Sequence, residues 1–427
     1  MSGSPRPAAS RHLAMTLLAA LLLLASWLPV AGQAWAAAET ITIEQSEATA
    51  SFPEGITFRL VAESRRPIQR VELLYNVADD PTLNLLVPTF EPGRRIEVEE
   101  LLNLQIYYLP AGIDISYRWR IEDDRGAVVE TEPETLLWLD TRFDWQALTA
   151  DDVTVYSYTG NEAFSRLILE SAQTTVDRLK VEYGLSEVTP IRIWVYNSRE
   201  DFNATKQANE KHWAVGTAYP NYHVILATIP EGSKREVGRV IPHEVSHQLL
   251  YQATKNPFNS PPLWLDEGLA VYAQDVGNED DFAQVQDAAS KGRLYSIRAL
   301  ISDFPTTGPY QLAYAESHSI VAFVIERFGI EKMRELIAAY REGVSHDEAL
   351  RRSLGVDTDE LDRLWKESLG YQGDHPDGVS GYVETAPSEP GVGLGLIVLA
   401  AATLAGGLSL LIIRARWLWR QQATRPV

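Results

Sequence analysis

The segment that most constrains the fold is HEVSH (243–247), in which two histidines stand four residues apart. On an α-helix, four residues correspond to a rotation of about 400°, so the imidazoles of His243 and His247 project from one face, one turn apart. Such a pair can occupy two corners of a tetrahedral Zn²⁺ site. Glu244 is rotated by about 100° from His243. It can therefore reach a water molecule beside the metal and act as a general base.

A fold built around this histidine pair must supply a third ligand, and the candidate is Glu267 in PPLWLDEGLAVYAQ (261–274). The apolar residues of that segment recur at helical spacing. Taken alone, Glu267 could be a surface acid of an acidic protein. An acid projecting inward from an apolar helical face is costly unless it meets a cation. Two histidines and one glutamate leave the fourth zinc position open, as a catalytic site requires. We therefore expect one Zn²⁺ per chain.

The motifs HEVSH and WLDEGLAVY, with the order of the surrounding segments, resemble those of the gluzincin metallopeptidases. This is the peptidase MA-like group that includes thermolysin and aminopeptidase N, and the resemblance covers roughly residues 150–370. It implies that His243, His247 and Glu267 bind zinc and that Glu244 is the base. The motifs are less specific for the substrate, which we expect to be a peptide or protein. The resemblance also implies that an edge strand within residues 213–227 binds the substrate backbone by strand addition.

The sequence departs from that family pattern in three places. Pro242 directly precedes His243, so the helix either starts near Pro242 or is kinked just before the site. No motif like the GAMEN sequence of aminopeptidase N is present, which argues against an aminopeptidase. Thermolysin-like enzymes have an aspartate four residues after the third ligand, where this chain has Val271. Asp266 and Asp275 are nearby substitutes that the sequence does not rank.

A transition-state donor is also required, because hydration of a peptide carbonyl builds an oxyanion. The segment YQLAYAESHSIVAFVIERFG (310–329) resembles the downstream helix of the family. Tyr314 is the first candidate for this catalytic role, and His318, one turn later, is the second. Both residues could instead be structural, with Tyr314 in the core and His318 at the surface.

The region before the motifs is predicted to be all-β. Residues 113–121, IDISYRWRI, alternate strictly between apolar and polar side chains, which is typical of a half-buried strand. The segments ITFRLVA (56–62) and IQRVELLYNV (68–77) are strand-like and are separated by the polar link SRRP. Several short strands with turn signals predict an Ig- or fibronectin-like β-sandwich over residues 39–148. This domain could serve as a spacer or as a module that binds a carbohydrate or a protein.

From residue 149 the pattern changes to strands followed mostly by helices, which predicts an α+β zinc metallopeptidase domain over residues 149–372. The expected elements are a helix at 161–184, strands at 191–197 and 223–230, and helices at 319–329, 331–343 and 359–370. Residues 373–390 are rich in glycine, proline and acid, and they are expected to form a stalk.

The two ends of the chain carry uncharged apolar runs. Residues 13–28 follow two arginines and precede small residues that suit a signal peptidase, so residues 1–38 are interpreted as a cleaved signal peptide; an uncleaved anchor is the alternative. Residues 391–413 are 23 residues without a charge and are predicted to form a transmembrane helix. Arginines follow in the tail, 414–427, which indicates a cytoplasmic tail and an extracytoplasmic catalytic domain at the cell membrane.

The amino-acid composition excludes several classes of protein. The absence of cysteine excludes disulfide scaffolds, zinc ribbons and thiol proteases. A net charge of −20, from 38 basic and 58 acidic residues, argues against nucleic-acid binding. Two alternatives to a peptidase stay open: a non-catalytic cell-surface binding or adhesion protein that retains a metallopeptidase fold, and a zinc hydrolase of non-peptide substrates. The sequence does not indicate the oligomeric state or the choice between endo- and exopeptidase.

Overall fold

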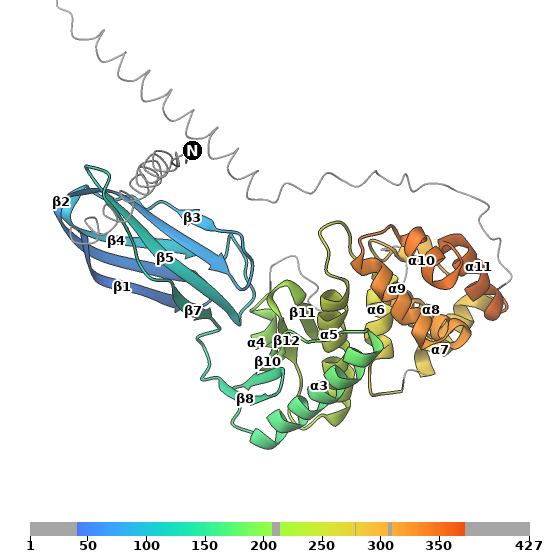
Figure 1. Cartoon of the computed structure of the whole chain (residues 1–427). Helices are drawn as coiled ribbons and strands as arrows, with labels where there is room; N and C mark the ends of the chain where they lie inside the picture. Colours follow the sequence, from blue (N-terminus) through green and yellow to red (C-terminus); the bar gives the residue numbers. More distant parts are fainter. Residues whose placement is uncertain (1–40, 207–213, 278, 306–309, 372–427) are drawn as a thin grey trace, which may run out of the picture. The chain divides into compact units, whose positions relative to one another are not determined.

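The computed structural model describes residues 41–206, 214–277, 279–305 and 310–371 (Figure 1). They form a mixed α/β protein that begins with a β-rich region, as the sequence predicts, and ends in helices. Two compact units are present: the described residues of Met1–Thr175 and Thr189–Gln248, and those of Val176–Val188 and Leu249–Val427. We call these unit 1 and unit 2. Helices α3 (Glu162–Glu182) and α5 (Lys234–Thr254) each contribute residues to both.

One long strand, β2 (Gly55–Val77), organises the first sheet of unit 1. Two antiparallel neighbours pair along its first part, as far as Ser64 apart from one further pair at Ile68, and two others pair along its second part, from Ile68 onward. The first pair is β1 (Ile41–Ser51) and β4 (Gly93–Asn103), and the second is β3 (Asn84–Leu86) and β5 (Ile113–Asp123). Strands β6 (Val128–Glu130) and β7 (Glu134–Trp138) pair with β5.

The SRRP link was expected to separate two strands, and that expectation is wrong because the backbone stays extended through it. The pairing register shifts between Glu63 and Ile68, so Pro67 lies where ladder hydrogen bonds are already interrupted. A proline costs little at such a position, because its missing N–H is not needed.

The alternation predicted for residues 113–121 is confirmed by β5, whose inward-facing side chains are at most 4% exposed. They share one core with the buried side chains of β2, including Ile56, Phe58 and Leu60. Burial of each such side chain contributes roughly 1.5–3 kcal/mol. The β-rich region is therefore confirmed as a structural element, and its Ig-like class stays a prediction.

The second sheet of unit 1 has the strand order β11-β12-β10-β9-β8. Its strands are β8 (Gln146–Ala150), β9 (Val153–Ser157), β10 (Ile191–Tyr196), β11 (Gly216–Tyr219) and β12 (Val224–Thr228). β10 runs parallel to both β9 and β12, and α3 connects β9 to β10 as the crossover that a parallel pair requires. The two outer pairings are antiparallel. Within the described residues, β11 is an edge strand.

Helices make up the rest of the fold. In unit 1, the short α4 (Arg199–Asn203) follows β10. Unit 2 contains α6 (Leu263–Tyr272), α7 (Glu279–Ser290), α8 (Tyr310–Phe328), α9 (Ile330–Arg341), α10 (His346–Leu354) and α11 (Thr358–Ser368). The helices predicted at 319–329, 331–343 and 359–370 correspond to α8, α9 and α11.

No helix in the described part of the chain is long and apolar enough to span a membrane. The predicted signal peptide (1–38), stalk (373–390), transmembrane segment (391–413) and tail (414–427) lie outside the described residues. The predicted boundary after residue 148 falls inside β8, a strand of the second sheet. The domain limits stay a prediction.

A buried ionisable cluster lies in unit 2. Glu316 of α8 is 0% exposed, and both of its carboxylate oxygens accept the backbone N–H of Tyr295 at 3.2 Å. Lys366 of α11 is 2% exposed and pairs with Asp362 at 2.8 Å. Burial raises the pKa of Glu316 to about 8, although the Tyr295 N–H and Lys366 oppose the shift. Glu316 therefore keeps its proton at neutral pH.

We predict that Glu316→Gln stabilises the protein at alkaline pH relative to wild type. Between the ordinary pKa of 4.5 and about 8, the folded state retains a proton that the unfolded state releases. The contribution of this group to stability therefore falls as pH rises through that window. The free energy of unfolding of the variant minus that of wild type should increase by on the order of 2–4 kcal/mol between about pH 5 and about pH 9. Urea unfolding at both pH values measures it, and a pH-independent difference would contradict the assignment.

Candidate metal centre

The helix that carries the histidine pair is α5, and Pro242 lies inside it. The alternative in which the helix begins near Pro242 is therefore wrong, because the helix begins at Lys234. Val237, Val240 and Ile241 are at most 2% exposed, so the two turns before the proline are held by apolar packing. This burial offsets the hydrogen bond to Gly238 that a proline at position 242 cannot make.

A buried hydrogen bond within unit 1 fixes α5 against the second sheet. The side-chain amide of Gln248 donates to the backbone carbonyl of Val224 in β12 at 2.8 Å. Val245, on the same helix, is 0% exposed. Because a buried carbonyl requires a donor, this bond sets the rotation of α5 about its axis. The direction in which the two imidazoles project follows from that rotation.

The two imidazoles lie close together, as the spacing predicts. The Nε2 atoms of His243 and His247 are 3.3 Å apart, and the rings are nearly perpendicular, at 85°. A tetrahedral ion bound about 2.0–2.1 Å from each of two nitrogens holds those nitrogens about 3.3–3.4 Å apart. The observed separation therefore fits two corners of a zinc site.

Glu267 of α6 completes the group. One ligand atom from each of His243, His247 and Glu267 lies within 4.8 Å of the others, and all three residues are partly buried. Gly268, the next residue, is where α6 meets α8. A Cβ atom at that position would lie 2.4 Å from the carbonyl oxygen of Ser317, so only glycine permits this approach. The set of two imidazoles and one carboxylate suits a divalent transition metal.

Glu244 is 7% exposed and lies against β11. A Cβ atom at Gly216, the first residue of that strand, would lie 2.3 Å from the Oε1 atom of Glu244. The sequence predicts an edge strand within residues 213–227, and β11 is this edge. The candidate base and the edge strand therefore border the same space.

The two candidate oxyanion donors have different neighbours in the structure. The Tyr314 hydroxyl donates to Oε1 of Glu267 at 3.2 Å, so it reaches a member of the ligand group. His318 is 5% exposed, and its Nδ1 lies 3.2 Å from Oδ2 of Asp281 in α7, with the Phe282 ring beside it. Tyr314 therefore contacts a candidate ligand and His318 contacts α7, and the catalytic role of either residue stays a prediction.

The two substitutes for an orienting aspartate occupy different surroundings. Asp266 is half-buried in the first turn of α6, and Asp275 is exposed beyond the end of that helix. Neither belongs to the three-residue ligand group.

Three residues that hold the site were not predicted from the sequence: Gly216, Gln248 and Gly268. Only Gly268 carries a local signal, since a glycine inside a helical pattern costs about 1 kcal/mol and often indicates close packing. Gly216 and Gln248 act through residues 28 and 24 positions away. No local pattern reports such contacts.

Residues 171–370 match the family model described as the Peptidase MA superfamily. The matched segment contains α5, α6 and α8, and therefore all the residues of the candidate metal centre. This match supports the superfamily for the segment, whereas the finer gluzincin assignment stays a prediction. No curated protein matches the chain.

Two solved structures illustrate the structural comparison. A mutant of a two-domain M1 zinc metallopeptidase bound to L-arginine is 11% identical, over 79% of this chain and 96% of that chain, with a TM-score of 0.36. A β-1,3-glucan binding domain of carbohydrate-binding module family 56 is 18% identical, over 22% of this chain and 96% of that chain, with a TM-score of 0.15. Likenesses this weak carry no argument about fold or ligand.

We predict that Glu267→Ala weakens Zn²⁺ binding by more than about 100-fold, because loss of a residue that only orients a ligand already costs about 10–100-fold. Competition with a chromophoric chelator measures the affinity. Glu170→Ala, which removes an exposed carboxylate of α3, is the control for the change in net charge and should bind zinc as wild type does. Equal affinity in all three proteins would remove Glu267 from the ligand set.

Proposed function

We propose that the protein is a zinc-dependent metallopeptidase of the gluzincin type that hydrolyses peptide bonds. The observation that carries the proposal is the convergence of His243, His247 and Glu267, with Glu244 one residue from the first ligand. The superfamily match over residues 171–370 supports it. Two neutral imidazoles and one carboxylate would hold the ion and leave a position open for reactants.

When bound, zinc would polarise the scissile carbonyl and make water a stronger nucleophile near neutral pH. The carboxylate of Glu244 would take a proton from the attacking water and deliver it to the leaving amine nitrogen. Its burial against Gly216 holds it in one place, which is what a proton carrier needs.

The Tyr314 hydroxyl would donate a hydrogen bond to the oxygen that becomes negative as the carbonyl is attacked. It lies 3.2 Å from Oε1 of Glu267, a proposed ligand of the ion. The edge of β11 would bind the substrate backbone as an added antiparallel or parallel strand, because strand addition satisfies the open N–H and C=O groups of an edge.

We predict that Glu244→Gln retains about one zinc per chain and loses peptide cleavage by at least about 10³-fold, since the amide cannot accept the proton. Tyr314→Phe should also retain zinc and lose about 10²-fold, the usual cost of one oxyanion donor. Elemental analysis and cleavage of a synthetic peptide library measure both quantities.

The outcomes of this experiment separate the rival functions. Full cleavage by Glu244→Gln would contradict the mechanism. Zinc without cleavage by wild type would favour a hydrolase of non-peptide substrates. Absence of zinc would favour a surface binding protein that retains the fold.

We also propose a localisation: the protein crosses the cell membrane once, and its catalytic domain lies on the extracytoplasmic side. The apolar runs at 13–28 and 391–413, and the arginines after the second run, motivate it. We predict that the full chain sediments with membranes and that a chain ending at residue 390 is released in soluble form. Soluble full-length protein would contradict the anchor.

A further inference from the structure

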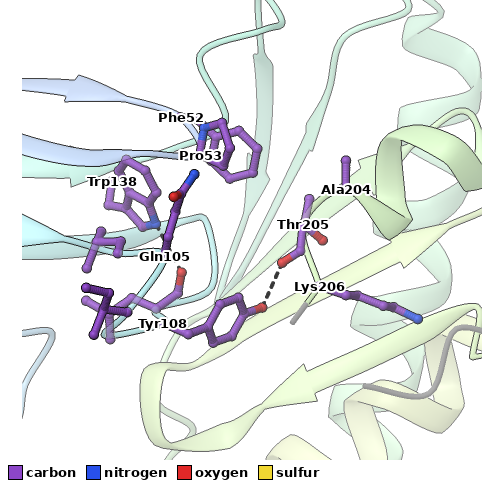
Figure 2. A pocket seen from close by; sticks show the side chains of 11 residues that line it. Phe52, Pro53, Gln105, Tyr108, Trp138, Ala204, Thr205 and Lys206 are labelled. Atoms are coloured by element: carbon purple, nitrogen blue, oxygen red, sulfur yellow. Dashed lines mark hydrogen bonds between the residues drawn. The ribbon is translucent and has the colours of Figure 1, made fainter. Parts of the chain in front are cut away.

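A pocket of about 480 Å³ lies within unit 1, and its lining residues do not include the histidine pair (Figure 2). Seven of its eleven lining residues are apolar, and they include Phe52, Leu104, Trp138 and Ala204. Its size is in the range of pockets that bury a small molecule or a large side chain. The pocket is therefore lined mostly by apolar side chains, and the polar groups of Gln105, Tyr108, Thr205 and Lys206 lie among them.

Two large side chains that are adjacent in the sequence are exposed beside the pocket. Ile106 is 72% exposed and lines the pocket, and Tyr107, next to it, is 54% exposed. Single exposed apolar residues are ordinary, whereas these two are adjacent and one of them lines the pocket, which gives a substrate side chain apolar surface to contact.

The pocket is connected to the edge strand through one tyrosine. The Tyr108 hydroxyl, which lines the pocket, donates to the backbone carbonyl of Thr205 at 2.9 Å and lies 2.9 Å from the hydroxyl of Tyr219. Tyr219 is the last residue of β11. Figure 2 shows the Tyr108 side chain reaching across the pocket to Thr205.

The same strand connects the pocket with the candidate base. Gly216 at the start of β11 lies against Glu244, and Tyr219 at its end contacts the pocket residue Tyr108. Three residues of a strand span about 10 Å. A peptide added to the edge of β11, with its scissile bond beside Glu244, would therefore reach the pocket about three to five residues from that bond.

We propose that this pocket is a distant subsite that takes an aliphatic or aromatic side chain of an extended peptide substrate, about three to five residues from the scissile bond. The inference rests on the proposed function and adds a specificity determinant to it. The β-rich region is then part of substrate recognition, because it supplies Phe52, Leu104, Tyr108 and Trp138.

The test uses a substitution that fills the pocket with a larger side chain and removes no existing contact. Ala204 is exposed and adopts a right-handed helical conformation after α4, so Ala204→Trp introduces a large ring with no backbone strain. Glu200→Trp is the matched control: Glu200 lies in α4, four residues before Ala204, is exposed and does not line the pocket.

Cut sites are mapped by mass spectrometry after digestion of a synthetic library of 14-residue peptides by the full chain. Wild type and Glu200→Trp should favour Leu, Ile, Phe or Tyr about three to five residues from the cut. The ratio of kcat/KM for apolar over Ser or Gly peptides at that position should fall about 10-fold or more in Ala204→Trp, within the range for one apolar side chain. Cleavage with no such preference in wild type, or an unchanged ratio in Ala204→Trp, would overturn the subsite and leave the peptidase assignment intact.

Failure of the proposed function gives a different result. If wild type cuts no peptide, the same library is captured on the immobilised Glu244→Gln chain and on the Glu244→Gln/Ala204→Trp chain. Enrichment of apolar peptides by the first chain only would support the pocket as a peptide-binding site without catalysis. Equal capture by both chains would overturn it.

Discussion

Three polar side chains from α5 and α6 must meet at one point among largely apolar neighbours, and this requirement governs the structure. Imidazole and carboxylate groups that lose water in such a place need partners, and one cation can satisfy all three. The rest of the architecture serves this convergence. Gln248 ties α5 to the second sheet, and Gly268 lets α6 approach α8 closely. Both contacts bear on where the ligand atoms lie, and a metal site needs its ligands held to within about 0.5 Å.

The sequence predicts which residues could bind the metal better than it predicts which contacts hold those residues in place. The spacing of His243 and His247 follows from helical geometry alone, and Glu267 was found because an acid on an apolar face needs a cation. The order of Tyr314 before His318 rests on placement alone, since residues four apart share a helix face and local pattern separates them poorly. It depends on which neighbour each side chain meets, and those neighbours are Glu267 in α6 and Asp281 in α7.

In the β-rich region, contacts between residues far apart in the sequence determine features that local sequence patterns do not predict. The alternation of residues 113–121 predicted β5, whereas the SRRP link looked like a break and is part of β2. Tyr108 and Tyr219 are 111 positions apart, yet their hydroxyls meet between the β-rich region and the end of β11. A region interpreted as either a spacer or a binding module thus contributes most of a pocket next to the proposed substrate strand. This placement favours a recognition role for the β-rich region.

The most direct test of the account is the location of the ion itself. Anomalous diffraction collected at the zinc absorption edge, from crystals grown with stoichiometric zinc, would show its position among the side chains. The account predicts one strong peak about 2.0–2.2 Å from the Nε2 atoms of His243 and His247 and from a carboxylate oxygen of Glu267. A peak bound elsewhere, or one that lacks any of these three ligands, would contradict it.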